Sequence, residues 1–245
     1  MKCCSWFCVA VFSLATIASS GATADDEAAS GVRVVPNLMG LPVSQTAMAR
    51  TLLFGNLATR NPEKALALLR NASDSHYGPA EFVLGGVLAN DKQDTAKINE
   101  GSEYLARAAR DGCSGATGLL GNMLYAASAQ HPETEAVALK FLRAGAEGGD
   151  ALAQGMLAAA YSRGSRSLPK EPVAAYAWVR LSLSHQQQSQ RMHDASTALE
   201  QRVLGALEKG DRERAEKLAT EFLARYGRQK YAFCSQSDDL TKSPE

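Results

Sequence analysis

Residues 101–112 read GSEYLARAARDG, and the first five of them have counterparts at three other places in the chain. The counterparts are ALALL at 65–69, ALKFL at 138–142 and AYAWV at 175–179, so successive units begin 36, 37 and 37 residues apart. Each block opens with a small residue, and it carries a large residue three places later with an aliphatic residue directly after it. A fixed period of this length indicates a solenoid of stacked helical or helix-containing units.

The correspondence continues through the second half of each unit. Gly112 and Gly149 stand eleven places after the start of their units, while the first unit has His76 at that position. A second apolar run follows in each of the first three units, and it begins at Ala80, Ala116 and Ala153. Apolar residues recur at spacings of three and four, which is the helical period. Each unit is therefore predicted to be two antiparallel helices, with glycine at the helix end because it tolerates the left-handed conformation.

The composition agrees with an all-α fold. Apolar residues make up 45% of the 245 residues, and the helix formers Ala and Leu dominate them. The 26 Lys and Arg residues balance the 26 Asp and Glu residues. Because nucleic acids and anionic membranes attract an excess of basic residues, neither is expected as a partner.

Helices outside the repeats are expected to cap the array, because a terminal unit has only one neighbour. One capping helix is predicted at residues 44–58, and two more at 190–209 and 211–226. Residues 44–226 are thus expected to form the solenoid with its caps. Residues 25–43 and 227–245 are expected to be a flexible N-terminal segment and a flexible tail.

The first 24 residues have the pattern of a cleavable signal peptide. Lys2 precedes an apolar stretch, and Ala22-Thr23-Ala24 matches the small-x-small cleavage pattern. The alternative is a membrane anchor, but the apolar run is shorter than the roughly 20 residues that a spanning helix needs. Cleavage after Ala24 is predicted, which gives a periplasmic or secreted protein without a membrane span.

Two cysteines remain after that cleavage, Cys113 and Cys234. An oxidising compartment would permit a disulfide bond between them, which would pin the tail to the array. Two unpaired thiols are the alternative, and the sequence does not choose between them.

The sequence lacks the common motifs of catalysis and cofactor binding. It contains no P-loop, no G-x-G-x-x-G, no G-x-S-x-G, no H-E-x-x-H and no C-x-x-C. No catalytic residue, metal site or cofactor is therefore predicted. Cys113 would be a thiol nucleophile only if His76 or His131 folded beside it.

Basic residues recur at or next to one repeat position in the first helix of every unit. Arg70, Arg143 and Arg180 share one repeat position, and Arg107 lies one place further on. First helices of a stacked array lie side by side, so these arginines could form a stripe that binds an acidic protein or peptide partner. The alternative is that they only solvate the helix surface.

The stretch Tyr104-Leu105-Ala106-Arg107-Ala108-Ala109-Arg110-Asp111-Gly112 resembles the first-helix signature of the Sel1-like repeat family, a relative of the tetratricopeptide repeats. Ala175-Tyr176-Ala177-Trp178 resembles it too, and the resemblance covers residues 62–186. It implies a right-handed α-solenoid of antiparallel helix pairs. The fourth unit departs from the pattern, because Gln190 and Asp194 stand where Ala and Leu are expected in a second helix.

The resemblance also implies a function. Sel1-like proteins usually act as non-enzymatic adaptors in multiprotein assemblies, so a protein–protein interaction scaffold of the bacterial cell envelope is expected. A protein that binds peptidoglycan or another glycan is an alternative. An enzyme that interacts with β-lactams is a further one, but that branch of the family has a cysteine pair in every repeat, and this sequence does not.

Overall fold

The structure is a computed structural model that describes residues 40–91, 93–185, 189–227 and 234. All of them belong to one compact unit. The expected signal peptide and most of the expected flexible segment at 25–43 lie outside the described residues. Of the expected tail at 227–245, only Gly227 and Cys234 are described.

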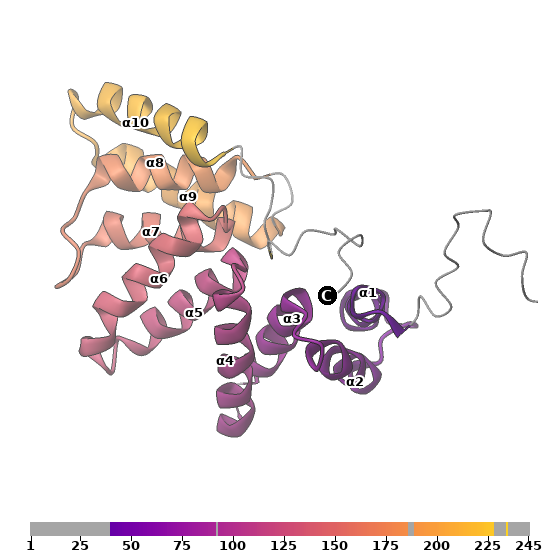
Figure 1. The fold of residues 1–245 in the computed structure, drawn as a ribbon. Coiled ribbons are helices and arrows are strands. Elements are labelled where there is room, and N and C mark those ends of the chain that lie inside the picture. Colours follow the sequence, from indigo (N-terminus) through magenta and orange to yellow (C-terminus); the bar gives the residue numbers. More distant parts are fainter. Residues whose placement is uncertain (1–39, 92, 186–188, 228–233, 235–245) are drawn as a thin grey trace, which may run out of the picture. The chain divides into compact units, whose positions relative to one another are not determined.

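The described residues form ten α-helices and one short 3₁₀ helix, and they contain no strand (Figure 1). In chain order these are α1 (Pro42–Phe54), α2 (Pro62–Ser73), α3 (Gly78–Ala89), α4 (Thr95–Arg110), α5 (Ser114–Ala127), η3 (Pro132–Thr134), α6 (Glu135–Glu147), α7 (Ala151–Arg163), α8 (Pro172–Leu183), α9 (Gln190–Ala206) and α10 (Asp211–Tyr226). The predicted all-α solenoid is confirmed.

The helices pair as the repeat predicts. Three units consist of α2 with α3, α4 with α5 and α6 with α7, and α8 begins the fourth. The sequence showed no usual second helix for that fourth unit, yet α9 packs against α8 and α7 in the place of one. Its long span supplies Leu199 and Val203 to the core, although its sequence departs from the repeat.

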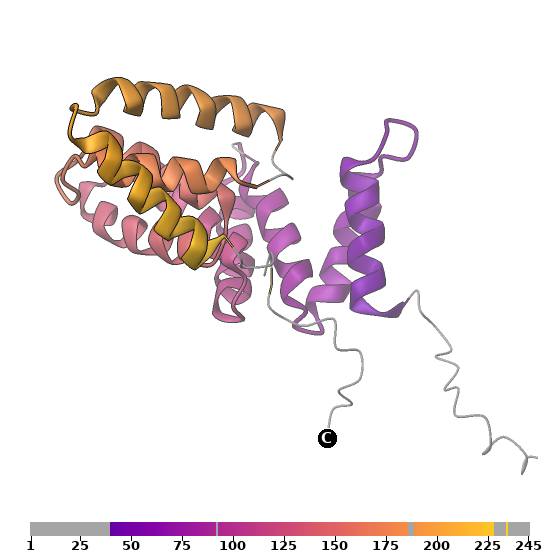
Figure 2. The ribbon, with the colours of Figure 1, turned by 90° about the horizontal axis from the view of Figure 1, so that it is seen from above.

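Extra helices flank the units at both ends. The first, α1, packs against α2 and α3, as the second helix of a preceding unit would. At the other end α10 lies against α8 (Figure 2), where Phe222 and Tyr226 contact Trp178 with ring centroids 4.7 and 5.7 Å apart. Trp178 is thus a packing residue and not part of an exposed platform.

The turns inside the units have the predicted backbone conformation. Gly112 and Gly149 have φ angles of 87° and 91°, and the first unit places His76 at the same position with φ 53°. A side chain with a Cβ is strained in this left-handed region, so His76 holds a conformation that glycine adopts freely.

Consecutive units are joined by contacts between backbones. A Cβ built on Gly85 of α3 would lie 2.7 Å from the carbonyl oxygen of Gly101 in α4. A Cβ built on Gly121 of α5 would lie 2.7 Å from the backbone nitrogen of Leu142 in α6. Only small residues fit here, and the third junction places Ala158 and Ala175 at the corresponding repeat positions, both fully buried.

We therefore expect Gly121→Ala to destabilise the protein, because its new methyl group would push α5 away from α6. The expected loss in the free energy of unfolding is about 1–3 kcal/mol, measured by chemical denaturation. Gly205→Ala is the matched control, since a Cβ at this exposed position of α9 meets no atom within 4 Å. Equal effects of the two substitutions would contradict the close packing of α5 on α6.

Candidate interaction groove

Each arginine of the predicted stripe is paired within the chain. Three pairs join neighbouring helices by ion pairs, and one joins them through a phenol. The pairs are Arg70 with Glu100 at 2.9 Å, Arg107 with Glu81 at 3.3 Å, Arg180 with Glu200 at 3.1 Å, and Arg143 with the Tyr161 hydroxyl at 2.5 Å. An acidic partner would have to displace these internal contacts. That the four arginines bind a partner stays a prediction.

The Glu81–Arg107 pair differs from the others because its acid is buried. The Glu81 side chain is 1% exposed, and neither of its carboxylate oxygens makes a hydrogen bond. Burial raises the pKa of Glu81, and the nearby Arg107 opposes that rise without cancelling it. The Arg107 guanidinium also lies 4.3 Å from the centroid of the Tyr104 ring.

The equivalent position is Thr117 in the second unit and a hydrogen-bonded amide in the third. Two units later it is occupied by Gln154, whose Nε2 donates to the carbonyl oxygen of Ala146 at 3.0 Å. The other end of the Gln154 amide contacts His185 Nε2 at 2.9 Å. The carbonyl that corresponds to Ala146 belongs to Ser73, and an acid at position 81 cannot donate to it once ionised.

A groove of about 810 Å³ lies between α1, α3 and α5. We call it the second-helix groove, because α3 and α5 are second helices and α1 packs as one. Its lining residues are Thr46, Arg50, Leu53, Phe54, Tyr77, Pro79, Phe82, Val83, Gly86, Val87, Ala89, Asn90, Leu119, Asn122, Met123 and Cys234. Most are apolar, and Phe54 at the end of α1 is 67% exposed.

The groove follows from the composition of the second helices. Within α3 the one charged residue is Glu81, which is buried, and α5 has no charged residue. A helix that is apolar on all sides is usually enclosed by protein. Here the face of α3 that carries Val83 and Val87 is left partly open, which makes it a candidate interaction site.

Repetition extends this surface along the array. Val83 and Val87 of α3 correspond to Leu119 and Met123 of α5, 36 residues later. Second helices of successive units also contact one another, from α1 through α3, α5 and α7 to α9. A smaller hollow of about 250 Å³ between α7 and α9 continues the same face, with Met156 in the column of Leu119.

The groove has few polar groups, and three of them have no partner in the described part of the chain. Arg50 is exposed and is the one charged residue of the lining. Its guanidinium makes no ion pair with a described residue, unlike those of Arg70, Arg107 and Arg180. The side-chain amides of Asn90 and Asn122 likewise have no described hydrogen-bond partner.

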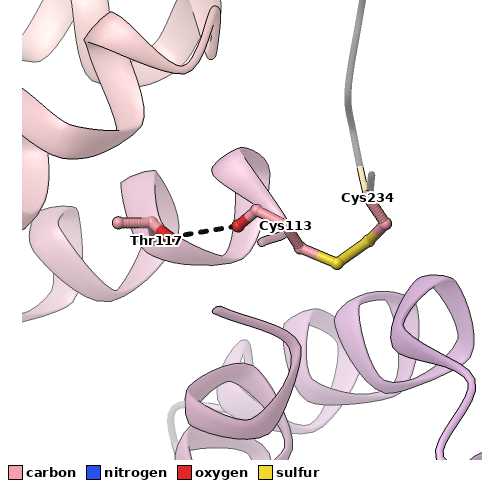
Figure 3. The surroundings of a disulfide bond; sticks show 3 residues. All are labelled: Cys113, Thr117 and Cys234. Atoms are coloured by element: carbon pink, nitrogen blue, oxygen red, sulfur yellow. Dashed lines mark hydrogen bonds between the residues drawn. A yellow bond between two sulfur atoms is a disulfide. The ribbon is translucent and has the colours of Figure 1, made fainter. Parts of the chain in front are cut away.

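A disulfide bond joins the groove to the C-terminal part of the chain. Cys113, at the start of α5, is bonded to Cys234 (Figure 3). Cys113 is fully buried, its carbonyl oxygen accepts from the Thr117 hydroxyl at 3.1 Å, and Cys234 lines the groove. The bond therefore fixes a residue that lies beyond α10 against the wall formed by α3 and α5.

The remaining candidates do not assemble into a catalytic or metal site. Within the described ranges no three His, Cys, Asp or Glu side chains are grouped as metal ligands would be. Cys113 is engaged in the disulfide bond, and His131 is paired with Glu133 at 3.3 Å. None of the described helices is long and apolar enough to cross a membrane.

The fold is an α-solenoid of antiparallel helix pairs, and comparison with solved structures specifies the kind. The c5321 protein, a protective antigen of uropathogenic Escherichia coli with an SLR fold, is 20% identical with a TM-score of 0.66. The match covers 83% of this chain but 42% of that chain, so this protein spans less than half of c5321. A Sel1 repeat protein from Oxalobacter formigenes is 21% identical with a TM-score of 0.56, over 74% and 71% of the two chains.

This chain thus has the fold of Sel1-like repeat proteins, and the predicted resemblance is confirmed at the level of the fold. Comparison of the sequence with family models and with curated proteins gives no match.

The burial of Glu81 gives a prediction for stability. We expect Glu81→Gln to raise the free energy of unfolding by about 1 kcal/mol at pH 7, because a neutral amide avoids the cost of burying charge and can donate to the Ser73 carbonyl oxygen. Denaturant unfolding from pH 4 to 8 measures this. Burial raises the folded-state pKa of Glu81 above 4.5, so the folded protein favours the protonated side chain. The stability that this protonation contributes is fully present below pH 4.5 and is lost as pH rises through the folded-state pKa.

Glu81→Gln should remove that part of the pH dependence, whereas Glu103→Gln, at an exposed position of α4, should leave it unchanged. A less stable Glu81→Gln variant would mean that the ion pair with Arg107 outweighs the burial of the charge.

Proposed function

We propose that this protein is a non-enzymatic scaffold of the bacterial cell envelope that binds a protein partner through the second-helix groove. The observation that carries the proposal is the apolar groove of about 810 Å³, built on helices that have almost no charge. A solenoid presents such a surface by stacking equivalent positions of successive units. Covering this apolar surface with apolar side chains of a protein partner removes it from water, which contributes favourable free energy to binding.

The lining favours a protein over a glycan. A sugar ring presents hydroxyl groups in every direction and needs many hydrogen-bond partners, since a buried polar group without one is costly. The groove offers the side chains of Thr46, Arg50, Asn90 and Asn122 within a mainly apolar lining. Peptidoglycan is therefore the weaker candidate for this groove.

The chemistry of Cys113 supports a binding role over catalysis. A cysteine nucleophile acts as a free thiolate, and Cys113 is buried and bonded to Cys234. The β-lactam alternative has no feature of the described residues in its favour.

Export is part of the proposal. Disulfide bonds persist in oxidising compartments, and the Cys113–Cys234 bond joins residues 121 positions apart. The bond is consistent with cleavage of the signal peptide after Ala24 and with a periplasmic or secreted protein.

We expect the mature protein to be recovered from the periplasm or medium with an N-terminus at Asp25 and no free thiol. Cell fractionation, intact mass and thiol alkylation before and after reduction measure these three properties. Unprocessed protein with alkylated Cys113 and Cys234 in the cytoplasm would contradict export.

The groove itself is tested by placing a charge in its floor. We expect Val87→Glu to abolish capture of a partner after in-cell cross-linking, because a carboxylate in an apolar contact is costly to desolvate. Val137→Glu is the matched control, since Val137 is 46% exposed on α6 and lies outside the groove. The partner should then be purified and its affinity for both variants measured by calorimetry.

Circular dichroism and thermal unfolding must show that both variants fold. Equal binding to both folded variants would contradict use of the groove. If Arg143→Glu abolishes binding and Val87→Glu does not, the binding site is on the arginine stripe and not in the groove.

A further inference from the structure

We infer that the occupant of the second-helix groove is an amphipathic α-helix of about three turns, which carries an Asp or Glu side chain that pairs with Arg50. This inference rests on the proposed function, and it specifies the partner segment by its chemistry.

The dimensions of the groove suit a helix of that length. Its lining follows α3 from Tyr77, just before the helix, to Asn90, just after it. At 1.5 Å per residue, the 12 residues of α3 span about 18 Å, which is the length of three helical turns. Apolar side chains flank this path on α1 at Leu53 and on α5 at Leu119.

The shortage of polar groups in the lining favours a helix over an extended peptide. An extended segment brings backbone N–H and C=O groups that must find partners when they are buried. The amides of Asn90 and Asn122 are available, but the Thr46 hydroxyl already donates to the carbonyl oxygen of Pro42 at 2.7 Å. A helix satisfies its own backbone and lays an apolar stripe into such a groove.

The charge of the lining calls for an acid on the partner. The lining contains Arg50 and no Asp or Glu. In the smaller hollow Arg202 is likewise the one charged lining residue. An apolar wall beside a guanidinium that makes no ion pair with a described residue is complementary to an apolar segment that carries a carboxylate.

The position of Arg50 selects an acidic side chain over a terminal carboxylate. Arg50 stands 36 residues before Gly86, which itself stands 36 before Asn122, so the three share one repeat position on α1, α3 and α5. Gly86 lies within α3 and not at either end of it. The carboxylate should therefore belong to a side chain within the occupant helix, at a position next to its apolar stripe, and not to the C-terminus of the helix.

The test selects peptides from a phage-displayed library of random segments of about 16 residues, long enough for four turns. The bait is the oxidised, mature protein, and selection against Val87→Glu removes peptides that bind elsewhere. We expect enriched peptides to have apolar residues at i, i+3, i+4 and i+7 and one adjacent Asp or Glu. Synthetic copies should gain helical circular dichroism when they bind.

Calorimetry with these peptides then compares Arg50 variants. We expect Arg50→Glu to weaken binding about tenfold and Arg50→Lys to weaken it less, because lysine keeps the charge but loses the bidentate geometry. Arg60→Glu has the same change of charge outside the lining and should leave the affinity unchanged. A peptide with its acid replaced by the amide should bind wild type more weakly than the acidic peptide does, but more tightly than the acidic peptide binds Arg50→Glu, where two carboxylates repel each other.

Failure of this inference can be distinguished from failure of the proposed function. Enriched peptides that lack the apolar spacing, bind without helix formation or ignore Arg50→Glu would overturn this inference and leave the groove as the binding surface. If the selection yields no peptide that binds wild type in preference to Val87→Glu, the inference is overturned and the proposed function is also weakened.

Discussion

The approach of one unit's second helix to the next unit's first helix sets the geometry on which the rest of the molecule depends. At Gly85 and Gly121 the neighbouring backbone leaves no room for a methyl group, so the helices pack there at a distance that only glycine permits. Tight junctions of this kind also bring successive second helices into contact. The groove exists because α1, α3 and α5 are held side by side in this way.

Charge is distributed unequally between the two helices of a unit. The first helices α2, α4 and α6 carry most of the charged residues of the first three units, and their arginines tie neighbouring helices together. The second helices are almost uncharged and expose apolar side chains such as Val87 and Met123 to the groove. Arg50 differs from the other arginines because it lines this mainly apolar groove and has no acidic partner among the described residues.

Much of the fold could be predicted from the sequence because the repeat encodes local geometry. The positions of Gly112 and Gly149 predicted the left-handed helix ends. The place of α9 could not be predicted in this way. Its sequence departs from the repeat, and contacts with α7 and α8 decide where it lies.

The candidate site was harder to predict, for a physical reason. A column of arginines is visible in sequence, but the pairing of three of them with acids 20 to 30 residues away, and of Arg143 with the Tyr161 hydroxyl, depends on tertiary contacts. The sequence nevertheless carries one signal of the groove. The second helix at 78–89 has one charged residue and apolar residues on every side, so a face of it not covered by its own unit must meet another surface.

The central claim is that recognition takes place on the second-helix face. In-cell photo-cross-linking tests it directly, with a photoreactive residue at Asn122 in the groove or at Lys140, which is exposed on α6. The account predicts a specific protein adduct from position 122 that is absent from position 140. An adduct from position 140 alone would contradict it and place recognition on the first helices.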